Sequence, residues 1–138
     1  MGYTTKKDVV EVFESTFTER KPIDYTLVDQ WFQMAIEEFS VEIEPIEYNF
    51  DNEQFVFYDD KGNLSKLPKV YILILGYTIK KYYCERQYDK IVKRTNIIGK
   101  DLKLNNTDAD KKNARAELDY VNEKIFHYYQ KLKPTALS

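Results

Sequence analysis

The stretch that decides the fold is PKVYILILGYTIKKYYCERQYDKIVKR, residues 68–94. Its first residue, Pro68, suits the first turn of a helix, where its missing amide hydrogen is no loss. Residues 70–75 are apolar nearly all round, and a strand is an alternative for them, but the spacing that follows favours one long helix. That helix should end at Gly99 or at Asn96. One side of it carries Leu73, Tyr77, Cys84, Tyr88 and Ile91, and the other carries Arg86, Lys90, Lys93 and Arg94.

A second long helix is predicted after a connector over residues 100–106. Thr107 and Asp110 form a capping pattern at its start, and Pro134 ends it. Its apolar residues are spaced 4, 3, 4, 3 and 4, a heptad seam that pairs with another helix. The seam comprises Ala114, Leu118, Val121, Ile125, Tyr128 and Leu132. We expect the last two helices to be long and antiparallel. They precede a partner-docking tail formed by Pro134, Thr135, Ala136, Leu137 and Ser138.

Upstream of Pro68 the period of the pattern changes. Ile46, Tyr48 and Phe50 alternate with polar residues, as in a half-buried strand, and residues 55–58 supply a partner strand. We therefore predict a β-hairpin at about residues 46–58. Because an isolated hairpin is marginal in water, it must pack on a helix or on another subunit.

Two shorter helices are predicted before the hairpin. Thr5 and Asp8 form a capping pattern ahead of the first, and Pro22 closes it. Asp24 can cap the second, which should end before Pro45. The apolar positions of the first are Val9, Val12, Phe13 and Phe17; those of the second are Val28, Trp31, Phe32, Ala35 and Phe39, widened by Leu27, Met34 and Ile36. The fold class is therefore mainly α (α+β), with four helices and a hairpin between the second and third, in one domain over residues 1–133.

Composition excludes several classes of protein. A chain of 138 residues with 43% hydrophobic and 15% aromatic residues should fold as one domain. Cys84 is the only cysteine, so an internal disulfide is impossible, and this usage suits a reducing compartment. The longest apolar stretch, residues 71–75, falls far short of the roughly 20 residues that span a bilayer. We expect no membrane helix.

No catalytic constellation is recognised in the sequence. His127 is the only histidine, and Cys84 lies on an apolar face, where cysteine behaves as a small hydrophobe. The acidic pairs at 37–38 and at 42 and 44 are spaced for solvated helix faces, unlike paired catalytic acids, which share a pocket. We expect no enzyme activity, catalytic residue, cofactor or metal ligand.

Charge is divided unevenly along the chain. Residues 1–64 hold 5 Lys/Arg and 15 Asp/Glu, a net charge of −10, whereas residues 65–138 hold 16 and 8, a net charge of +8. If the two halves expose different sides of the domain, copies attract one another head-to-tail, and such contacts generate rings. The candidate interface pairs Arg86, Lys90, Lys93 and Arg94 with Glu37, Glu38, Glu42 and Glu44. The alternative, a plain solvated helix face, stays open because exposed ion pairs contribute little.

The order of elements and several strings resemble the small head–tail connector (adaptor, neck) proteins of tailed phages. The strings lie in the second half: the proline-started apolar helix running into YYCER at 82–86, RTNIIGKD at 94–101 and QKLKP at 130–134. Residues 1–66 match only in layout. The resemblance implies a homo-oligomeric ring in the virion, docked on a portal, with tail or second connector proteins as partners. It also implies passing contact with DNA in the channel, and no catalytic residues.

A second interpretation is a small cytoplasmic oligomeric adaptor or regulator that binds protein or nucleic acid. The tyrosine pairs 82–83 and 128–129 lie near basic residues, as in sites that stack nucleobases. Tyrosines on amphipathic helices also bury their rings in the core while their hydroxyl groups stay in contact with water. The acidic first half would repel a polyanion, which favours the core interpretation.

Overall fold

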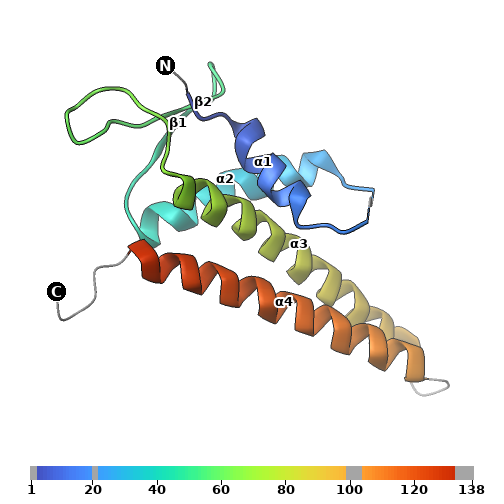
Figure 1. Cartoon of the computed structure of the whole chain (residues 1–138). Coiled ribbons are helices and arrows are strands. Elements are labelled where there is room, and N and C mark those ends of the chain that lie inside the picture. Colours follow the sequence, from blue (N-terminus) through green and yellow to red (C-terminus); the bar gives the residue numbers. More distant parts are fainter. Residues whose placement is uncertain (1–2, 20–21, 99–103, 133–138) are drawn as a thin grey trace.

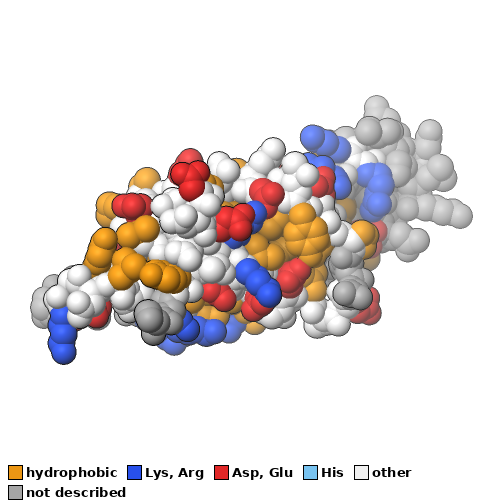
Figure 2. Space-filling model, turned by 90° about the horizontal axis from the view of Figure 1, so that it is seen from above, with side chains coloured by type: hydrophobic (Ala, Val, Ile, Leu, Met, Phe, Trp, Pro, Cys, Tyr) orange, Lys and Arg blue, Asp and Glu red, His pale blue; other side chains and the backbone are white. Residues whose placement is uncertain are grey.

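The computed structural model describes residues 3–19, 22–98 and 104–132, without the side chains of 95–98 and 104–108. The predicted fold class is confirmed: four helices carry a two-stranded antiparallel hairpin between the second and the third (Figure 1). The elements are α1 (Lys6–Ser15), α2 (Tyr25–Glu42), β1 (Glu47–Asn49), β2 (Gln54–Val56), α3 (Lys69–Ile98) and α4 (Leu104–Leu132). The molecule is elongated, as the view from above shows (Figure 2). Within the described ranges, no helix is long and apolar enough to cross a membrane.

Helix α3 is the centre of the fold, because α1, α2 and α4 all pack against it. In Figure 1, α1 and α2 lie on one side of α3, and α4 runs antiparallel along another side. Ile74, Leu75 and Ile79 are fully buried. Residues 70–75 are helical and the strand alternative is wrong, since helices cover this half of α3 on several sides and leave no polar face. Pro68 lies just before the first turn, where its carbonyl accepts from the amides of Tyr71 and Ile72.

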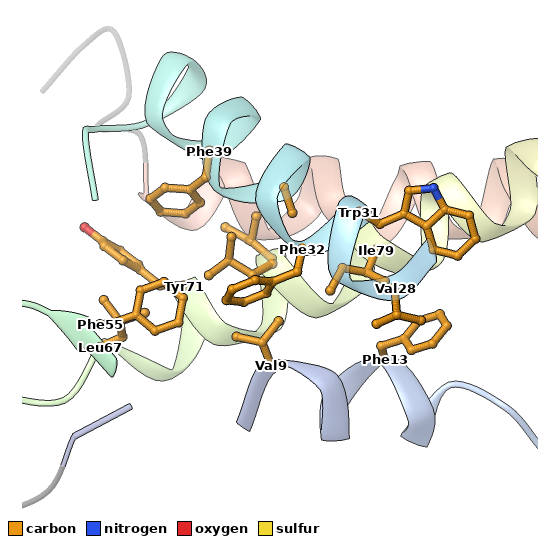
Figure 3. Packing of buried hydrophobic residues seen from close by; sticks show 13 residues of the cluster. Val9, Phe13, Val28, Trp31, Phe32, Phe39, Phe55, Leu67, Tyr71 and Ile79 are labelled. Atoms are coloured by element: carbon orange, nitrogen blue, oxygen red, sulfur yellow. The ribbon is translucent and has the colours of Figure 1, made fainter. Parts of the chain in front are cut away.

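The main core joins α1, α2 and α3. Figure 3 shows Val9 and Phe13 of α1, Phe32 of α2 and Ile79 of α3 pointing toward one another. The predicted stripe of α2 is buried in full, but Met34 is 44% exposed, so including it in the core was wrong. The helix buries one stripe against α3, and Met34 lies beyond the edge of that contact.

A glycine sets how closely α1 approaches α3. A Cβ atom placed on Gly76 would lie 2.6 Å from the Cβ of Val12, closer still to its Cγ1, and 3.1 Å from the carbonyl oxygen of Val9. Real side chains do not approach so closely, so the two backbones pack at this distance only because residue 76 has no side chain.

The predicted caps of the first two helices are confirmed. The backbone amide of Thr5 donates to Asp8 Oδ2 at 2.8 Å, and Asp24 Oδ1 accepts from the amide of Thr26 at 2.9 Å. The first helix ends at Ser15, earlier than its apolar pattern suggested. Phe17 lies beyond that end and still packs on the core, with its ring centroid 5.0 Å from that of Tyr83.

The hairpin packs on α2, as expected because an isolated hairpin is only marginally stable in water. Its strands are shorter than predicted and pair Tyr48 with Phe55. The ring of Phe32 lies 5.0 Å from that of Tyr48 and 5.8 Å from that of Phe55. The N-terminal segment extends the hairpin, since the amide of Phe55 donates to the carbonyl of Thr4 at 2.8 Å.

Helices α3 and α4 form a long antiparallel pair. The seam of α4 faces α3: Leu118, Val121 and Ile125 form a second buried cluster with Cys84. The prediction that Thr107 opens the last helix was wrong, because α4 begins at Leu104 and so continues the pair opposite the end of α3. The expected stop at Gly99 and the tail at 134–138 lie outside the described residues.

Candidate functional site

The predicted basic residues lie on the C-terminal half of α3, and all four are exposed. Arg94 is already paired within the chain: its Nη2 lies 3.0 Å from Asp110 Oδ2 of α4. Both partners are about half exposed, so this ion pair contributes little to stability. Arg86, Lys90 and Lys93 remain as the basic residues available to a partner.

The predicted acidic residues lie at the C-terminal end of α2 and just beyond it. Glu37, Glu42 and Glu44 are exposed. Glu38 is different, because it accepts from Lys81 Nζ at 2.7 and 2.8 Å and from the hydroxyl of Tyr82 at 2.8 Å. Burial, reinforced by Glu38, raises the pKa of Tyr82 well above its ordinary value, so the tyrosine stays a donor. Glu38 therefore ties α2 to α3 and is not an interface candidate.

Glu42 and Glu44 lie far from the basic set within one copy, whereas Glu38 lies beside Tyr82, one helical turn before Arg86. The last turns of α2 are at the end of the molecule that carries the hairpin, and the last turns of α3 are at the other end (Figure 1). The structure therefore does not bring the predicted partners together inside the chain. This is the arrangement that head-to-tail contact between copies requires.

Two grooves flank the C-terminal half of α3. The α2–α3 groove, of about 300 Å³, has both apolar and charged walls. It is lined by Leu27, Trp31, Met34, Tyr82, Glu85, Arg86, Asp89, Lys90 and Lys93. Three bases and two acids share its rim, so its charge is nearly balanced.

The α3–α4 groove, of about 440 Å³, is more basic. Its lining is Tyr88, Lys111, Lys112, Arg115, Ala116 and Asp119. Asp119 Oδ1 pairs with Arg115 Nε at 3.2 Å, and the Arg115 guanidinium lies 5.8 Å from the ring centroid of Tyr88. This leaves Lys111 and Lys112 in excess beside an apolar floor.

Sequence reasoning missed the α3–α4 groove. The available signal was the helical spacing of Lys111, Lys112 and Arg115, three bases on one helix. Recognising the groove also required the register of α4 on α3, which decides that Tyr88 lies beside them.

The hairpin end of the molecule gathers exposed apolar residues. Hydrophobic side chains cluster at this end in the space-filling view (Figure 2). The exposed members are Tyr3, Phe50, Tyr58 and Leu64. Acidic residues surround them in the sequence, at positions 47, 51, 53, 59 and 60. This end is therefore both apolar and acidic.

The candidate groups for chemistry occupy unreactive places. Cys84 is 3% exposed, and burial, reinforced by Glu117, raises its pKa to about 12, so its thiol is protonated and shielded. His127 lies exposed on α4. No group of three or more potential metal ligands occurs among the residues that the structure describes.

No protein-family model matches this chain, and no curated protein or solved structure matches it. The likeness to phage connectors therefore depends on the quoted strings and on the element order. The tyrosine pairs are better explained by packing, because Tyr82, Tyr83, Tyr128 and Tyr129 are partly buried against the main core.

Proposed function

We propose that this protein is a structural assembly subunit, a head–tail connector (adaptor) that forms a ring at the portal of a tailed-phage virion. The observation that carries the proposal is the placement of exposed acids at the hairpin end, Glu42, Glu44, Asp51 and Glu53, and of exposed bases on the C-terminal half of α3 and the facing part of α4. The order of elements also agrees with the layout that suggested this family.

Opposite ends favour one mode of association. An acidic end attracts the basic end of the next copy, and a contact between different surfaces of identical chains propagates until the rotation closes a ring. Charges at the rim of such a contact mainly raise the encounter rate and select the orientation. Burial of aromatic and other apolar side chains then supplies much of the affinity.

The finer parts of the proposal concern the assembly around the ring. Its partners are the portal on one side and tail or second connector proteins on the other. The tail at 134–138 reaches one of these partners, and DNA passes through the channel. The virion, assembled in the host cytoplasm, is its location.

Sedimentation and electron microscopy test the proposal on the purified chain. We expect species much larger than the 16.5 kDa chain at low salt and closed rings in the images. The assemblies should weaken toward about 1 M salt, where charges are screened beyond roughly 3 Å. A single copy under every condition of salt and concentration would refute the proposal.

One observation favours a second function, a cytoplasmic oligomeric adaptor or regulator that binds protein or nucleic acid. Lys111, Lys112 and Arg115 beside Tyr88 combine positive charge with an aromatic ring, as single-stranded nucleic acid sites do. Titration with DNA and RNA at rising salt separates the two functions. Binding that falls steeply with salt, in a preparation without rings, would support the second function.

A further inference from the structure

The turn of the hairpin, residues 50–53, is a fixed projection. Asn49 Oδ1 accepts from the amides of Asp51 at 2.9 Å and of Asn52 at 3.1 Å, so a side chain holds the turn. Glu53 has a φ of 56°, which few residues other than glycine adopt, and it brings the chain back into β2. A turn held in this way loses little conformational entropy when it binds.

This turn presents an aromatic side chain between acidic neighbours. Phe50 is 58% exposed, and its ring packs edge-on against Tyr48 at 4.8 Å, so its inner edge is supported while much of the ring faces solvent. Asp51, Asn52 and Glu53 are all exposed. The turn is thus an apolar knob flanked by two negative charges.

The α3–α4 groove has the complementary character. Its floor includes Tyr88 and Ala116, and among the lining residues that the structure describes Lys111 and Lys112 exceed the one acid, Asp119, which Arg115 already pairs. The α2–α3 groove fits an acidic knob less well, because Glu85 and Asp89 line it beside its bases. The groove and the turn lie toward opposite ends of the molecule, so one copy cannot fill its own groove (Figure 1).

We propose that the hairpin turn of one copy docks in the α3–α4 groove of the next copy. Phe50 lies on Tyr88 and Ala116, while Asp51 and Glu53 approach Lys111 and Lys112. This inference rests on the proposed head-to-tail assembly and names the contact that would form it.

The first test truncates the knob. Phe50→Ser should weaken self-association about 30-fold, the loss typical of an aromatic at the centre of an interface. The matched control is Phe126→Ser, which removes a 62% exposed ring from α4 outside the groove lining and should leave association unchanged. Circular dichroism confirms that both variants fold. Equal association of wild type and Phe50→Ser would overturn the inference.

The second test exchanges charges between the two surfaces. Asp51→Lys/Glu53→Lys makes both surfaces basic, and Lys111→Glu/Lys112→Glu makes both acidic, so each double variant alone should stay monomeric. In a 1:1 mixture, each turn meets a groove of opposite charge, and association should return. Failure of the mixture to assemble, while wild type does, would overturn the inference.

The third test locates the contact. Copies with Asn52→Cys are mixed with copies with Lys112→Cys and treated with a short bismaleimide, while the buried Cys84 stays shielded. We expect links between the two kinds of copy and few between like copies, measured by mass spectrometry. Links mainly between two Asn52→Cys copies would overturn the inference.

The outcomes distinguish this inference from the proposed function. Rings that survive Phe50→Ser, with the mixed link missing, refute the docking of the turn and leave the assembly proposal standing. Wild-type protein that stays a single copy in all conditions refutes the assembly proposal itself, and the docking with it.

Discussion

Replacing Gly76 by alanine sets two physical effects against each other. In the interior of a helix, alanine is more favourable than glycine by about 1 kcal/mol. At Gly76, however, the new Cβ would lie 2.6 Å from the Cβ of Val12 and 3.1 Å from the carbonyl oxygen of Val9. Rotating the Val12 side chain moves its methyl groups but not its Cβ, so α1 itself must move away from α3.

The overlap should outweigh the gain in helix propensity. Forcing an extra carbon into a packed core costs about 1–3 kcal/mol, and the cost here should lie in the upper part of this range, at about 2–3 kcal/mol, because the contact includes atoms that cannot rotate away. We expect Gly76→Ala to lower the free energy of unfolding by about 1–2 kcal/mol net. Urea denaturation followed by the fluorescence of Trp31, the only tryptophan, measures this difference, because Trp31 lies in the same core.

Moving the glycine to the facing helix tests the cause. Val12→Gly alone should cost about 2 kcal/mol, from lost apolar burial and from glycine in a helix. The double variant Val12→Gly/Gly76→Ala restores a small residue at the crossing, so it should lose about 1–2 kcal/mol less than the sum of the single variants. Additive losses, or a Gly76→Ala variant more stable than wild type, would refute close packing as the role of Gly76.

Three further predictions follow from named contacts. Lys80 is 3% exposed, with its Nζ 3.6 Å from the ring centroid of Phe17 and 2.9 Å from Glu117 Oε1. Lys80→Met should therefore lower the free energy of unfolding by about 1 kcal/mol or less, measured by urea denaturation. Glu117→Ala leaves the buried ammonium of Lys80 without its partner and should lower it by about 2–3 kcal/mol. A larger loss for Lys80→Met than for Glu117→Ala would contradict this reasoning. Burial raises the pKa of Cys84 from 9.0 to about 12, so the native state retains a proton that the unfolded chain loses. Thermal stability should thus fall as the pH rises from about 9 toward 12, and it should fall less steeply in Cys84→Ala. An equal dependence on pH in wild type and Cys84→Ala would contradict this prediction. Lys90→Glu/Lys93→Glu should lower the fraction of assembled protein that sedimentation detects at low salt, without changing the fold. An unchanged fraction would show that these lysines do not belong to the interface.

The predictable part of the fold is the part with regular apolar spacing. The stripe of α2 and the heptad seam of α4 place their residues on one face by helix geometry alone. The stripe is buried in full, and the seam is buried at Leu118, Val121 and Ile125 and half-buried at its other members. The caps at Asp8 and Asp24 could be recognised because a cap involves residues close in sequence.

The missed features depend on the register between elements. Thr107 had a good capping pattern, but a cap contributes only about 1 kcal/mol, and α4 begins three residues earlier, at Leu104. Nothing near Gly76 in the sequence indicates that Val12 faces it. Glu38 appeared to be a solvated acid because Lys81 and Tyr82, its hydrogen-bond partners, are more than 40 residues away.

The two halves of α3 explain why fold and assembly can be tested separately. Three other helices and the hairpin region surround its first half, whereas its last turns extend with α4 beyond α1 and α2 (Figure 1). Charged residues collect on that extension because solvent reaches it, and the hairpin turn is exposed at the other end. Substitutions at Phe50, Lys90 or Lys112 therefore change surfaces that contribute little to the core, and a loss of association in such variants reports on the contact itself. A charge reversal at Glu38 would not report on the contact alone, because it would also break the hydrogen bonds that link α2 to α3.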